Sequence, residues 1–469
     1  MKQLPHICVI GAGSSGIAAC KVFQDQEIPV DCFEKSDRIG GNWAFKNNNG
    51  MSSAYRSLHI NTSRRQMVYS DFPMRDGTPD FPHHTQVIQY FNDYVEHFGL
   101  KKYITLNCGV AKCELTTDST WKVELDDRDV RYYDALCVAN GHHWDPRWPD
   151  PPYPGKFSGE QLHSHSYIDP TEPVDCIDKN IVIVGMGNSA LDIACELGHK
   201  GVARNVFLSV RRGYYIVPKY LGSETLDADD PHPSEDPPLI QRLTPTWLAR
   251  WRRRRHIESV VGRPEDYGLP QPNYPLGQTH PTISNEILIR IGSGDVIPKP
   301  NIANLDGEQI EFQDGTRENV DVLIYATGYN IKFPFFDSKF LSAPNNEIPL
   351  YKRIMHPKHH NLFFLALIQP LCATMPIAEE QSKWVAAHLT GACALPPQSR
   401  IDKETLAYYQ TIKRKYLDTP RHTIQINNCA AYAYGLRKDM HAGRNRANRL
   451  RNKPQGSVVH TNAVQNRAG

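Results

Sequence analysis

Three glycines and an acidic residue near the start of the chain have the types and spacing of a nucleotide-binding turn. Gly11, Gly13 and Gly16 form a G-x-G-x-x-G motif after a short apolar run, and a second apolar run ends at Glu34. The first glycine permits a tight turn, the second lets backbone approach a diphosphate, and the third lets the helix pack on the strand. Glu34 can accept hydrogen bonds from both ribose hydroxyls. The stretch therefore predicts a dinucleotide site.

The pattern is repeated in the middle of the chain, with one chemical difference. Gly185 and Gly187 belong to a G-x-G-x-x-A motif, and the apolar run 206–210 that follows ends on Arg211 and Arg212 instead of an acid. An acid selects free ribose hydroxyls, whereas arginines can hold a 2′-phosphate through charge-assisted, bidentate bonds. We therefore expect the first unit to bind FAD and the second to bind NADPH.

Motifs of this kind require parallel strands flanked by helices. The run 135–141 suits a strand beside the first nucleotide, and the run 320–325 suits a return of the chain to the first sheet. We expect an α/β fold of two doubly wound Rossmann-like dinucleotide-binding domains, with the NADP domain inserted into the FAD domain. The expected parts are FAD-binding residues 1–155, NADP-binding residues 156–319 with an insertion around 213–285, FAD-binding residues 320–435, and a basic polar tail at 436–469 that is disordered or wrapped on the surface.

A third motif lies between the two glycine motifs. In FSGEQLHSHSY, the residues Phe157, Gly159, His163 and Tyr167 have the spacing F-x-G-x-x-x-H-x-x-x-Y. This resembles the fingerprint of the flavin-containing monooxygenases. The resemblance extends over about residues 5–395 and includes, in order, GAGSSG, GGNW, the loop with Asn61 and YSDFP, the second glycine motif, YATGY, and the IQP strand with its following helix. Unlike the vertebrate-type members, which end in a hydrophobic anchor, this chain ends in a basic polar tail.

The resemblance implies an NADPH- and O2-dependent enzyme that oxygenates soft nucleophilic nitrogen or sulfur atoms through a C4a-hydroperoxyflavin. It implies a small amine or sulfide and O2 as partners, and we expect a homodimer. Asn61 corresponds to the family's catalytic asparagine, whose amide can hydrogen-bond the flavin or its hydroperoxide. Taken alone, an asparagine in a loop is a turn residue. We expect His163 to pack between the domains and not to act as a base.

The motifs and the resemblance together predict the cofactor contacts. A helix beginning near Pro376 could direct its positive end at the flavin. The residues expected at FAD are Gly11, Gly13, Ser14, Ser15, Gly16, Glu34, Lys35, Gly41, Asn42, Trp43, Thr62, Val110, Gly141, Gly328 and Gln369. The residues expected at NADP are Gly185, Gly187, Asn188, Ser189, Arg211 and Arg212. No metal site is expected.

Two other functions stay open. A Baeyer–Villiger monooxygenase uses the same cofactors to attack ketones, but its fingerprint ends in Trp where this chain has Tyr167. An NADPH oxidase or redox flavoprotein would keep both cofactor sites without a productive substrate pocket. Product formation from an amine or thioether separates these functions.

Composition limits the remaining classes. The 469 residues carry a net charge of +2, which argues against a nucleic-acid partner. The longest apolar run is far shorter than the roughly 18 residues of a membrane helix, and the N-terminus leaves no room for a signal peptide. Eleven cysteines without a C-x-x-C pair predict reduced thiols in a cytoplasmic protein. The stretch 243–257 predicts a basic helix with a solvated face, or alternatively a peripheral contact with anionic lipid or an acidic partner.

Overall fold

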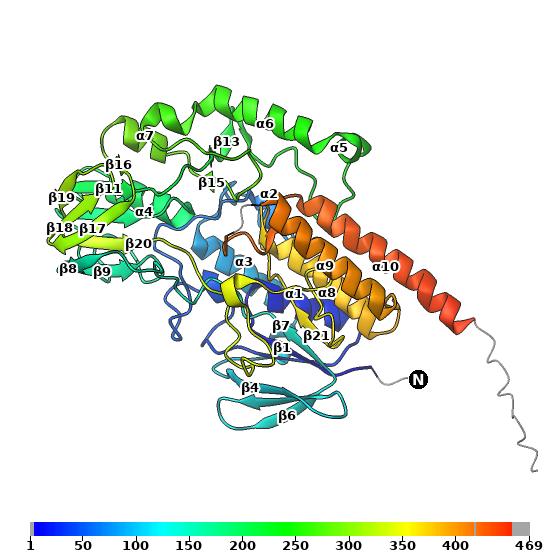
Figure 1. Cartoon of the computed structure of the whole chain (residues 1–469). Coiled ribbons are helices and arrows are strands. Elements are labelled where there is room, and N and C mark those ends of the chain that lie inside the picture. Colours follow the sequence, from blue (N-terminus) through cyan, green and yellow to red (C-terminus); the bar gives the residue numbers. More distant parts are fainter. Residues whose placement is uncertain (1–3, 417–418, 453–469) are drawn as a thin grey trace, which may run out of the picture.

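The first glycine motif lies on a five-stranded parallel sheet whose strands come from distant parts of the chain. The computed structural model describes residues 4–416 and 419–452 (Figure 1). The sheet order is β21 (Leu362–Phe364), β7 (Ala135–Val138), β1 (Ile7–Ile10), β2 (Val30–Phe33) and β3 (Ile104–Thr105). All pairs are parallel. Strands β1 and β7 are apolar and buried at every position, as expected for a parallel sheet that is covered on both faces.

Helices cover one face of this sheet and an antiparallel sheet covers the other. Helix α1 (Ser14–Asp25) packs between the sheet and α8 (Thr374–Leu389), with α3 (His84–His97) alongside. On the opposite face, Trp121 and Phe364 belong to one buried cluster that joins the two sheets. The antiparallel strands are β4 (Val110–Leu115), β5 (Trp121–Leu125) and β6 (Val130–Tyr133).

The second glycine motif lies on another five-stranded parallel sheet. Its order is β16 (Ile297–Lys299), β11 (Asn205–Ser209), β10 (Asn180–Val184), β20 (Val322–Tyr325) and β9 (Glu160–His163). Helices α4 (Asn188–Leu197) and α7 (Ile287–Gly292) pack on one face. The other face carries β8 (Gly155–Phe157), β17 (Ile302–Gly307), β18 (Gln309–Phe312) and β19 (Arg317–Asn319). The predicted pair of doubly wound domains, the second inserted into the first, is confirmed.

The strand predicted at 320–325 lies in a different sheet from the one expected. The run 320–325 was expected to return to the first sheet, but β20 pairs with β10, and the chain rejoins the first sheet only at β21. The reason is that the two sheets are built alike: β20 is the parallel neighbour of β10 in the second sheet, as β7 is the parallel neighbour of β1 in the first. The Ala326 N–H donates to the Val184 carbonyl at 2.9 Å, just as the Ala139 N–H donates to the Ile10 carbonyl at 2.9 Å. Strand β20 therefore completes the second nucleotide fold.

Between β11 and α7 the chain forms a long insertion. It carries α5 (Leu239–Leu243) and α6 (Thr246–Val261), which lie across the top of Figure 1. Helix α6 confirms the helix predicted at 243–257. The short strands of the insertion are β12 (Ile216–Val217) with β15 (Thr282–Ile283), and β13 (Tyr220–Leu221) with β14 (Glu224–Thr225). The remaining short helices of the chain are α2 (Arg64–Met67), η1 (Gly41–Trp43), η2 (Leu100–Tyr103), η3 (Pro264–Tyr267) and η4 (Pro344–Asn346).

The prediction of a disordered or surface-wrapped tail is wrong for the part of it that the structure describes. Helix α10 (Cys429–Arg451) continues past residue 436 and packs on α8, beside α9 (Gln398–Lys415) (Figure 1). Ala433, Leu436 and Ala447 form its buried face, so small side chains bring the helices together where large apolar ones are few. Residues 453–469 lie outside the described part. No helix within the described ranges is long and apolar enough to cross a membrane.

The expectation of reduced thiols holds for most cysteines but not for all. Nine cysteines are free and buried, whereas Cys372 and Cys429 form a disulfide. The two are 57 residues apart in the sequence. They meet because β22 (Gln369–Pro370) pairs in parallel with β23 (Gln425–Ile426). The spacing of the cysteines alone carries no signal for this pairing.

Candidate active site

One large cavity connects the two glycine motifs. Its volume is about 1490 Å³, above the roughly 300–1,000 Å³ of a usual small-molecule pocket. Such a size suits two dinucleotides that meet. Every residue predicted at the site lines the cavity except Gly16. The structure thus brings Asn61 to the same cavity as both nucleotide motifs.

The three glycines of the first motif have different surroundings. Gly11 has a φ of +99°, and a Cβ there would lie 2.8 Å from the Ala139 carbonyl oxygen. A Cβ on Gly16 would lie 1.9 Å from the carbonyl oxygen of Gly11, so this glycine lets α1 pack on the sheet. In contrast, the atom nearest to a Cβ on Gly13 would be the Gly41 Cα, at 3.6 Å. The open space at Gly13, in front of α1, fits a diphosphate.

The carboxylate of Glu34 is held in place by backbone. The Ala12 N–H donates to Oε2 at 2.7 Å and the Ser36 N–H donates to Oε1 at 2.8 Å. Burial raises the pKa of Glu34, and the bonds from Ser36 and Ala12 oppose this rise. Each oxygen retains acceptor capacity on the cavity side, as two ribose hydroxyls require. Glu34 therefore fits FAD.

The start of α8 also faces the cavity. Cys372, Ala373, Thr374 and Met375 line it, so the positive end of the helix points at the cofactor space, as the sequence predicted. Nearby, Asn42 orients the loop after β2, because its Oδ1 accepts hydrogen bonds from the N–H and the hydroxyl of Ser53, both at 2.8 Å.

Gly328 lines the shared cavity on the segment after β20, and its contact with FAD stays a prediction. Gly328 follows β20, which belongs to the second sheet. A Cβ on Gly185 would lie 2.6 Å from the Ala326 carbonyl oxygen, just as a Cβ on Gly11 would lie 2.8 Å from the Ala139 carbonyl oxygen. Ala326 thus lies beside the second glycine motif, whereas the Gly328 carbonyl accepts a hydrogen bond from the Arg147 N–H at 2.9 Å.

The two arginines after β11 point in different directions. The Gly185 N–H donates to the Ser209 carbonyl, as the Gly11 N–H does to that of Phe33, so the position of Glu34 is occupied by the buried Val210. Arg211 is exposed at the rim of the cavity. The Arg212 guanidinium turns inward and donates to the Tyr214 hydroxyl from Nε at 3.2 Å and from Nη2 at 3.1 Å. This leaves Arg211 as the candidate for the 2′-phosphate.

Asn61 is half-buried on the cavity wall. Its amide makes no hydrogen bond to another described residue, so both its donor and its acceptor are available to a bound molecule. The insertion fixes its loop, because the Ser63 N–H donates to Asp227 Oδ2 at 2.9 Å. Sequence reasoning missed this contact, since the two residues are 164 positions apart and Asp227 belongs to no motif.

Tyr167 of the fingerprint lies where the two domains meet, whereas Phe157 packs within the second domain. The buried Tyr167 donates from its hydroxyl to Glu196 Oε2 of α4 at 2.9 Å. Tyr55, from the first domain, packs edge-on against Tyr167 and donates to Asp192 of the same helix. Burial lowers the pKa of His163 to about 4, so its ring is neutral near pH 7. These contacts support the predicted packing role of the fingerprint.

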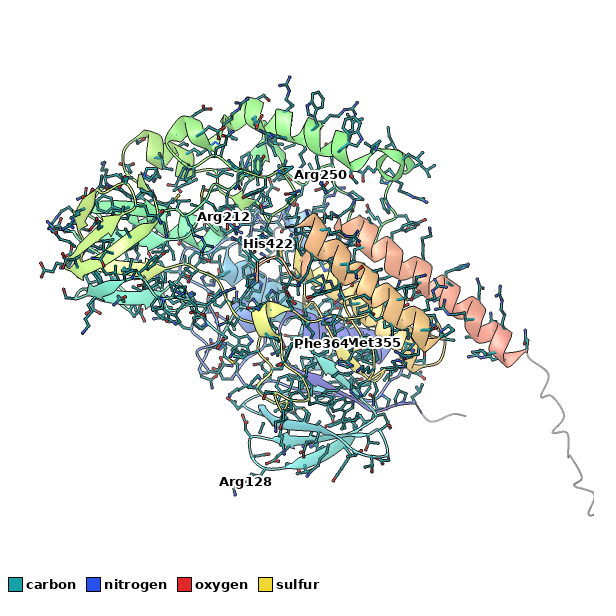
Figure 2. The ribbon with its side chains drawn as sticks, viewed as in Figure 1. Arg128, Arg212, Arg250, Met355, Phe364 and His422 are labelled. Atoms are coloured by element: carbon teal, nitrogen blue, oxygen red, sulfur yellow. A yellow bond between two sulfur atoms is a disulfide. The ribbon has the colours of Figure 1, made fainter. Side chains whose placement is uncertain are left out.

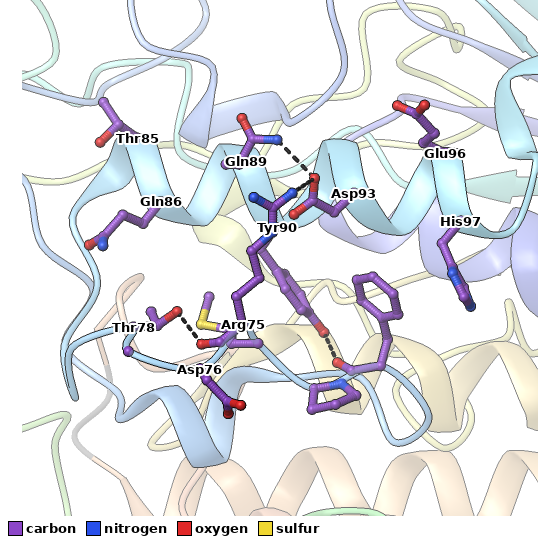
Figure 3. A pocket seen from close by; sticks show the side chains of 14 residues that line it. Arg75, Asp76, Thr78, Thr85, Gln86, Gln89, Tyr90, Asp93, Glu96 and His97 are labelled. Carbon is purple, nitrogen blue, oxygen red and sulfur yellow. Dashed lines mark hydrogen bonds and ion pairs between the residues drawn. The ribbon is translucent and has the colours of Figure 1, made fainter.

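A separate groove of about 690 Å³ lies between the loop at 72–78 and α3 (Figure 3). None of the predicted site residues lines it. Its polar groups bind one another: Asp93 Oδ1 accepts from Arg75 Nη2 at 2.7 Å and from Gln89 Nε2 at 2.8 Å. The groove is therefore not the candidate active site.

Known proteins resemble this chain over nearly its whole length. The family model described as flavin-binding monooxygenase-like matches residues 5–441. Flavin-containing monooxygenase 5 of Rattus norvegicus is 36% identical over 437 residues, covering 90% of this chain and 80% of that protein. The N-oxide-forming dimethylaniline monooxygenase 2 of Pan troglodytes is 33% identical over 439 residues, covering 88% and 80%. Among solved structures, the S-allyl-L-cysteine S-oxygenase of Allium sativum has a TM-score of 0.68 at 23% identity, covering 95% and 93%.

Proposed function

Because this chain belongs to the flavin-binding monooxygenase-like family and is an FAD-dependent NADPH monooxygenase, we propose that it oxygenates the nitrogen or sulfur atom of a small amine or sulfide. The observation that carries the proposal is the shared cavity, whose walls hold both nucleotide motifs and Asn61. The names of the N-oxide-forming relative and of the S-oxygenase support this substrate class.

The residues of the chain have distinct tasks in this proposal. Bound FAD supplies the redox chemistry with O2, and NADPH supplies the hydride. Glu34 and the start of α1 orient the first dinucleotide, and the second glycine motif orients the other. Asn61 presents an amide to the reacting atoms. Apolar cavity residues such as Ile60, Phe335 and Leu365 exclude water. A soft nucleophile needs no general base, so the proposal assigns no proton transfer to His163.

Turnover of a small substrate panel tests the proposed function. The FAD-loaded protein is given NADPH, O2 and either a tertiary amine, a thioether or a cyclic ketone. We expect an N-oxide or an S-oxide that forms in step with NADPH consumption. An ester or lactone from the ketone, without product from the other two, would establish the Baeyer–Villiger alternative. NADPH consumption that yields only hydrogen peroxide would establish the oxidase.

Arg211→Ala is expected to reduce the preference for NADPH over NADH by about ten- to one-hundred-fold. Loss of a charge-assisted bond to the 2′-phosphate costs about 1.5–3 kcal/mol, and NADH lacks this phosphate. The KM values of both dinucleotides provide the measurement. Arg204→Ala is the matched control, because Arg204 is exposed and binds Asp178 away from the cavity. An unchanged preference would remove Arg211 from the 2′-phosphate site.

We also propose a peripheral contact with anionic lipid at the insertion. Leu243, Trp247 and Trp251 recur every four residues, and their side chains are 80%, 69% and 55% exposed. Trp247 and Trp251 are four residues apart on α6 and therefore share one face of that helix, whereas Leu243 ends α5 just before it. Five arginines, at positions 250 and 252–255, are also on α6. Aromatic and apolar side chains beside arginines suit the interface of an anionic membrane.

Co-sedimentation with vesicles tests this contact. We expect binding to vesicles that contain phosphatidylserine, release by salt, and weaker binding of the double variant Trp247→Ser/Trp251→Ser. Leu406→Ser, at a 56% exposed position on α9, is the control. Equal sedimentation with and without phosphatidylserine would contradict the proposal.

A cytoplasmic location is part of the proposal. Nine free cysteines favour a reducing compartment, and the Cys372–Cys429 disulfide is the observation against it. The homodimer expected from the sequence stays a prediction. Light scattering of the FAD-loaded protein in solution measures its mass and tests the dimer.

A further inference from the structure

An arginine from outside the inserted domain lies at its glycine motif. Arg421 is on the segment between α9 and β23, which belongs to the first domain through the pairing of β23 with β22. A Cβ on Gly187 would lie 3.5 Å from Arg421 Nη1 and 3.6 Å from Nη2. Gly187 is the second glycine of the motif, where backbone approaches the diphosphate in a Rossmann fold. The guanidinium of Arg421 therefore lies at the expected diphosphate position of the second dinucleotide.

Arg421 belongs to a cluster of positive charge around Tyr214. The Cζ atoms of Arg421 and Arg212 lie 5.5 and 5.4 Å from the centre of the same tyrosine ring. Burial alone would raise the pKa of Tyr214, but Arg421 and Arg212 outweigh it, and this pKa is lowered. In the described ranges, no carboxylate lies within 4.0 Å of the nitrogen atoms of either guanidinium. Two neighbouring cations without a carboxylate partner are arranged to receive an anion.

The histidines beside the cluster add no positive charge to it. His422 is buried, next to Arg212 in the middle of the molecule (Figure 2). Burial, followed by the charges of Arg421 and Arg212, lowers the pKa of His422 to about 3. Burial and Arg421 likewise lower the pKa of His280 to about 4. Both rings are neutral near pH 7, so the charge of the cluster comes from the two arginines.

We propose that Arg421 binds the diphosphate of NADP(H), so that residues of both domains hold the dinucleotide at once. Arg211, at the rim, then contacts the 2′-phosphate, and Arg212 and Tyr214 keep the Arg421 guanidinium over Gly187. The inference rests on the use of NADPH, but not on the amine or sulfide proposed as substrate. It also separates two kinds of selectivity: a diphosphate contact holds NADP and NAD alike, whereas a 2′-phosphate contact holds NADP alone.

Binding of NADP+ and NAD+ to the oxidised, FAD-loaded protein tests this assignment by calorimetry. Arg421→Gln is expected to raise the Kd of both dinucleotides about ten-fold or more, because a charge-assisted bond is lost. Arg211→Ala is expected to raise the Kd of NADP+ alone. Arg414→Gln is the matched control, since Arg414 is exposed and bonds only to the Gln410 carbonyl of its own helix. Arg421→Lys keeps the positive charge but lacks the planar guanidinium that can donate two parallel hydrogen bonds. Its Kd values are expected to lie between those of wild type and of Arg421→Gln.

Unchanged Kd values for both dinucleotides in Arg421→Gln would overturn the proposal, as would a loss confined to NADP+. The flavin absorbance and the melting temperature report whether the variant is folded. If Arg421→Gln does not retain FAD, Arg421→Lys decides: wild-type Kd values for both dinucleotides would then overturn the proposal. The binding assay contains neither amine nor sulfide, so failure of the proposed oxygenation would not change its result.

Discussion

Gly16→Ala is expected to lower the melting temperature of the protein strongly, whereas Gly13→Ala is expected to keep the fold and to bind FAD weakly. A Cβ on Gly16 would lie 1.9 Å from the Gly11 carbonyl oxygen, and this is backbone that cannot rotate away. Forcing α1 off the sheet costs at least the roughly 1–3 kcal/mol of an overpacked core, out of a total stability of about 5–15 kcal/mol. A Cβ on Gly13 meets no atom closer than 3.6 Å, so the fold tolerates it.

In Gly13→Ala the added methyl group lies where the diphosphate approaches backbone, and we expect FAD affinity to fall about 100-fold, or about 2.7 kcal/mol. Thermal unfolding of the apoprotein and a FAD titration measure the two effects. Gly435→Ala is the control, because Gly435 lies inside α10 with no atom within 4 Å of a Cβ. It should stabilise the protein by about 0.5–1 kcal/mol. Equal melting temperatures of Gly16→Ala and Gly13→Ala would contradict this account of the motif.

Asn61→Leu is expected to separate NADPH consumption from oxygenation. The substitution keeps similar bulk but removes the donor and the acceptor that the cavity wall presents. FAD binding depends on the first glycine motif and Glu34, so the variant should purify yellow and still oxidise NADPH. Loss of one positioned donor lowers turnover by about 100-fold or more. We therefore expect oxygenated product to fall by that factor and hydrogen peroxide to replace it.

Product and peroxide per NADPH provide the measurement for Asn61. Asn92→Leu is the matched control, because Asn92 is exposed on α3 and bonds only to the Ile88 carbonyl. A normal yield of product from Asn61→Leu would leave Asn61 as a turn residue.

The features predicted correctly from the sequence are those with a local pattern. The glycine motifs, Glu34 and the start of α8 all lie at the cavity, because a strand, a tight turn and a helix are determined by neighbouring residues. The strand at 320–325 was misplaced because an apolar run does not indicate which sheet it joins. Helix α10 was missed because small residues such as Ala433 and Ala447 pack as well as large ones when helices are close.

The parts of the site that sequence reasoning missed arise from tertiary contacts. Arg421 reaches Gly187 from a segment more than two hundred residues further along the chain, and Asp227 holds the loop of Asn61 from the insertion. Neither residue belongs to a recognised motif. Arg212 was paired with Arg211 because the two are adjacent, but alternate directions along an extended chain separate their side chains.

Oxygen isotope labelling tests the central claim most directly. The FAD-loaded protein is supplied with NADPH, a thioether or tertiary amine, and ¹⁸O2 in unlabelled water, and the product is analysed by mass spectrometry. A flavin-dependent monooxygenase of nitrogen or sulfur should place one oxygen-18 atom in each molecule of S-oxide or N-oxide, with one product formed per NADPH. Unlabelled product, or NADPH consumed with hydrogen peroxide as the sole product from every amine and sulfide, would contradict the account.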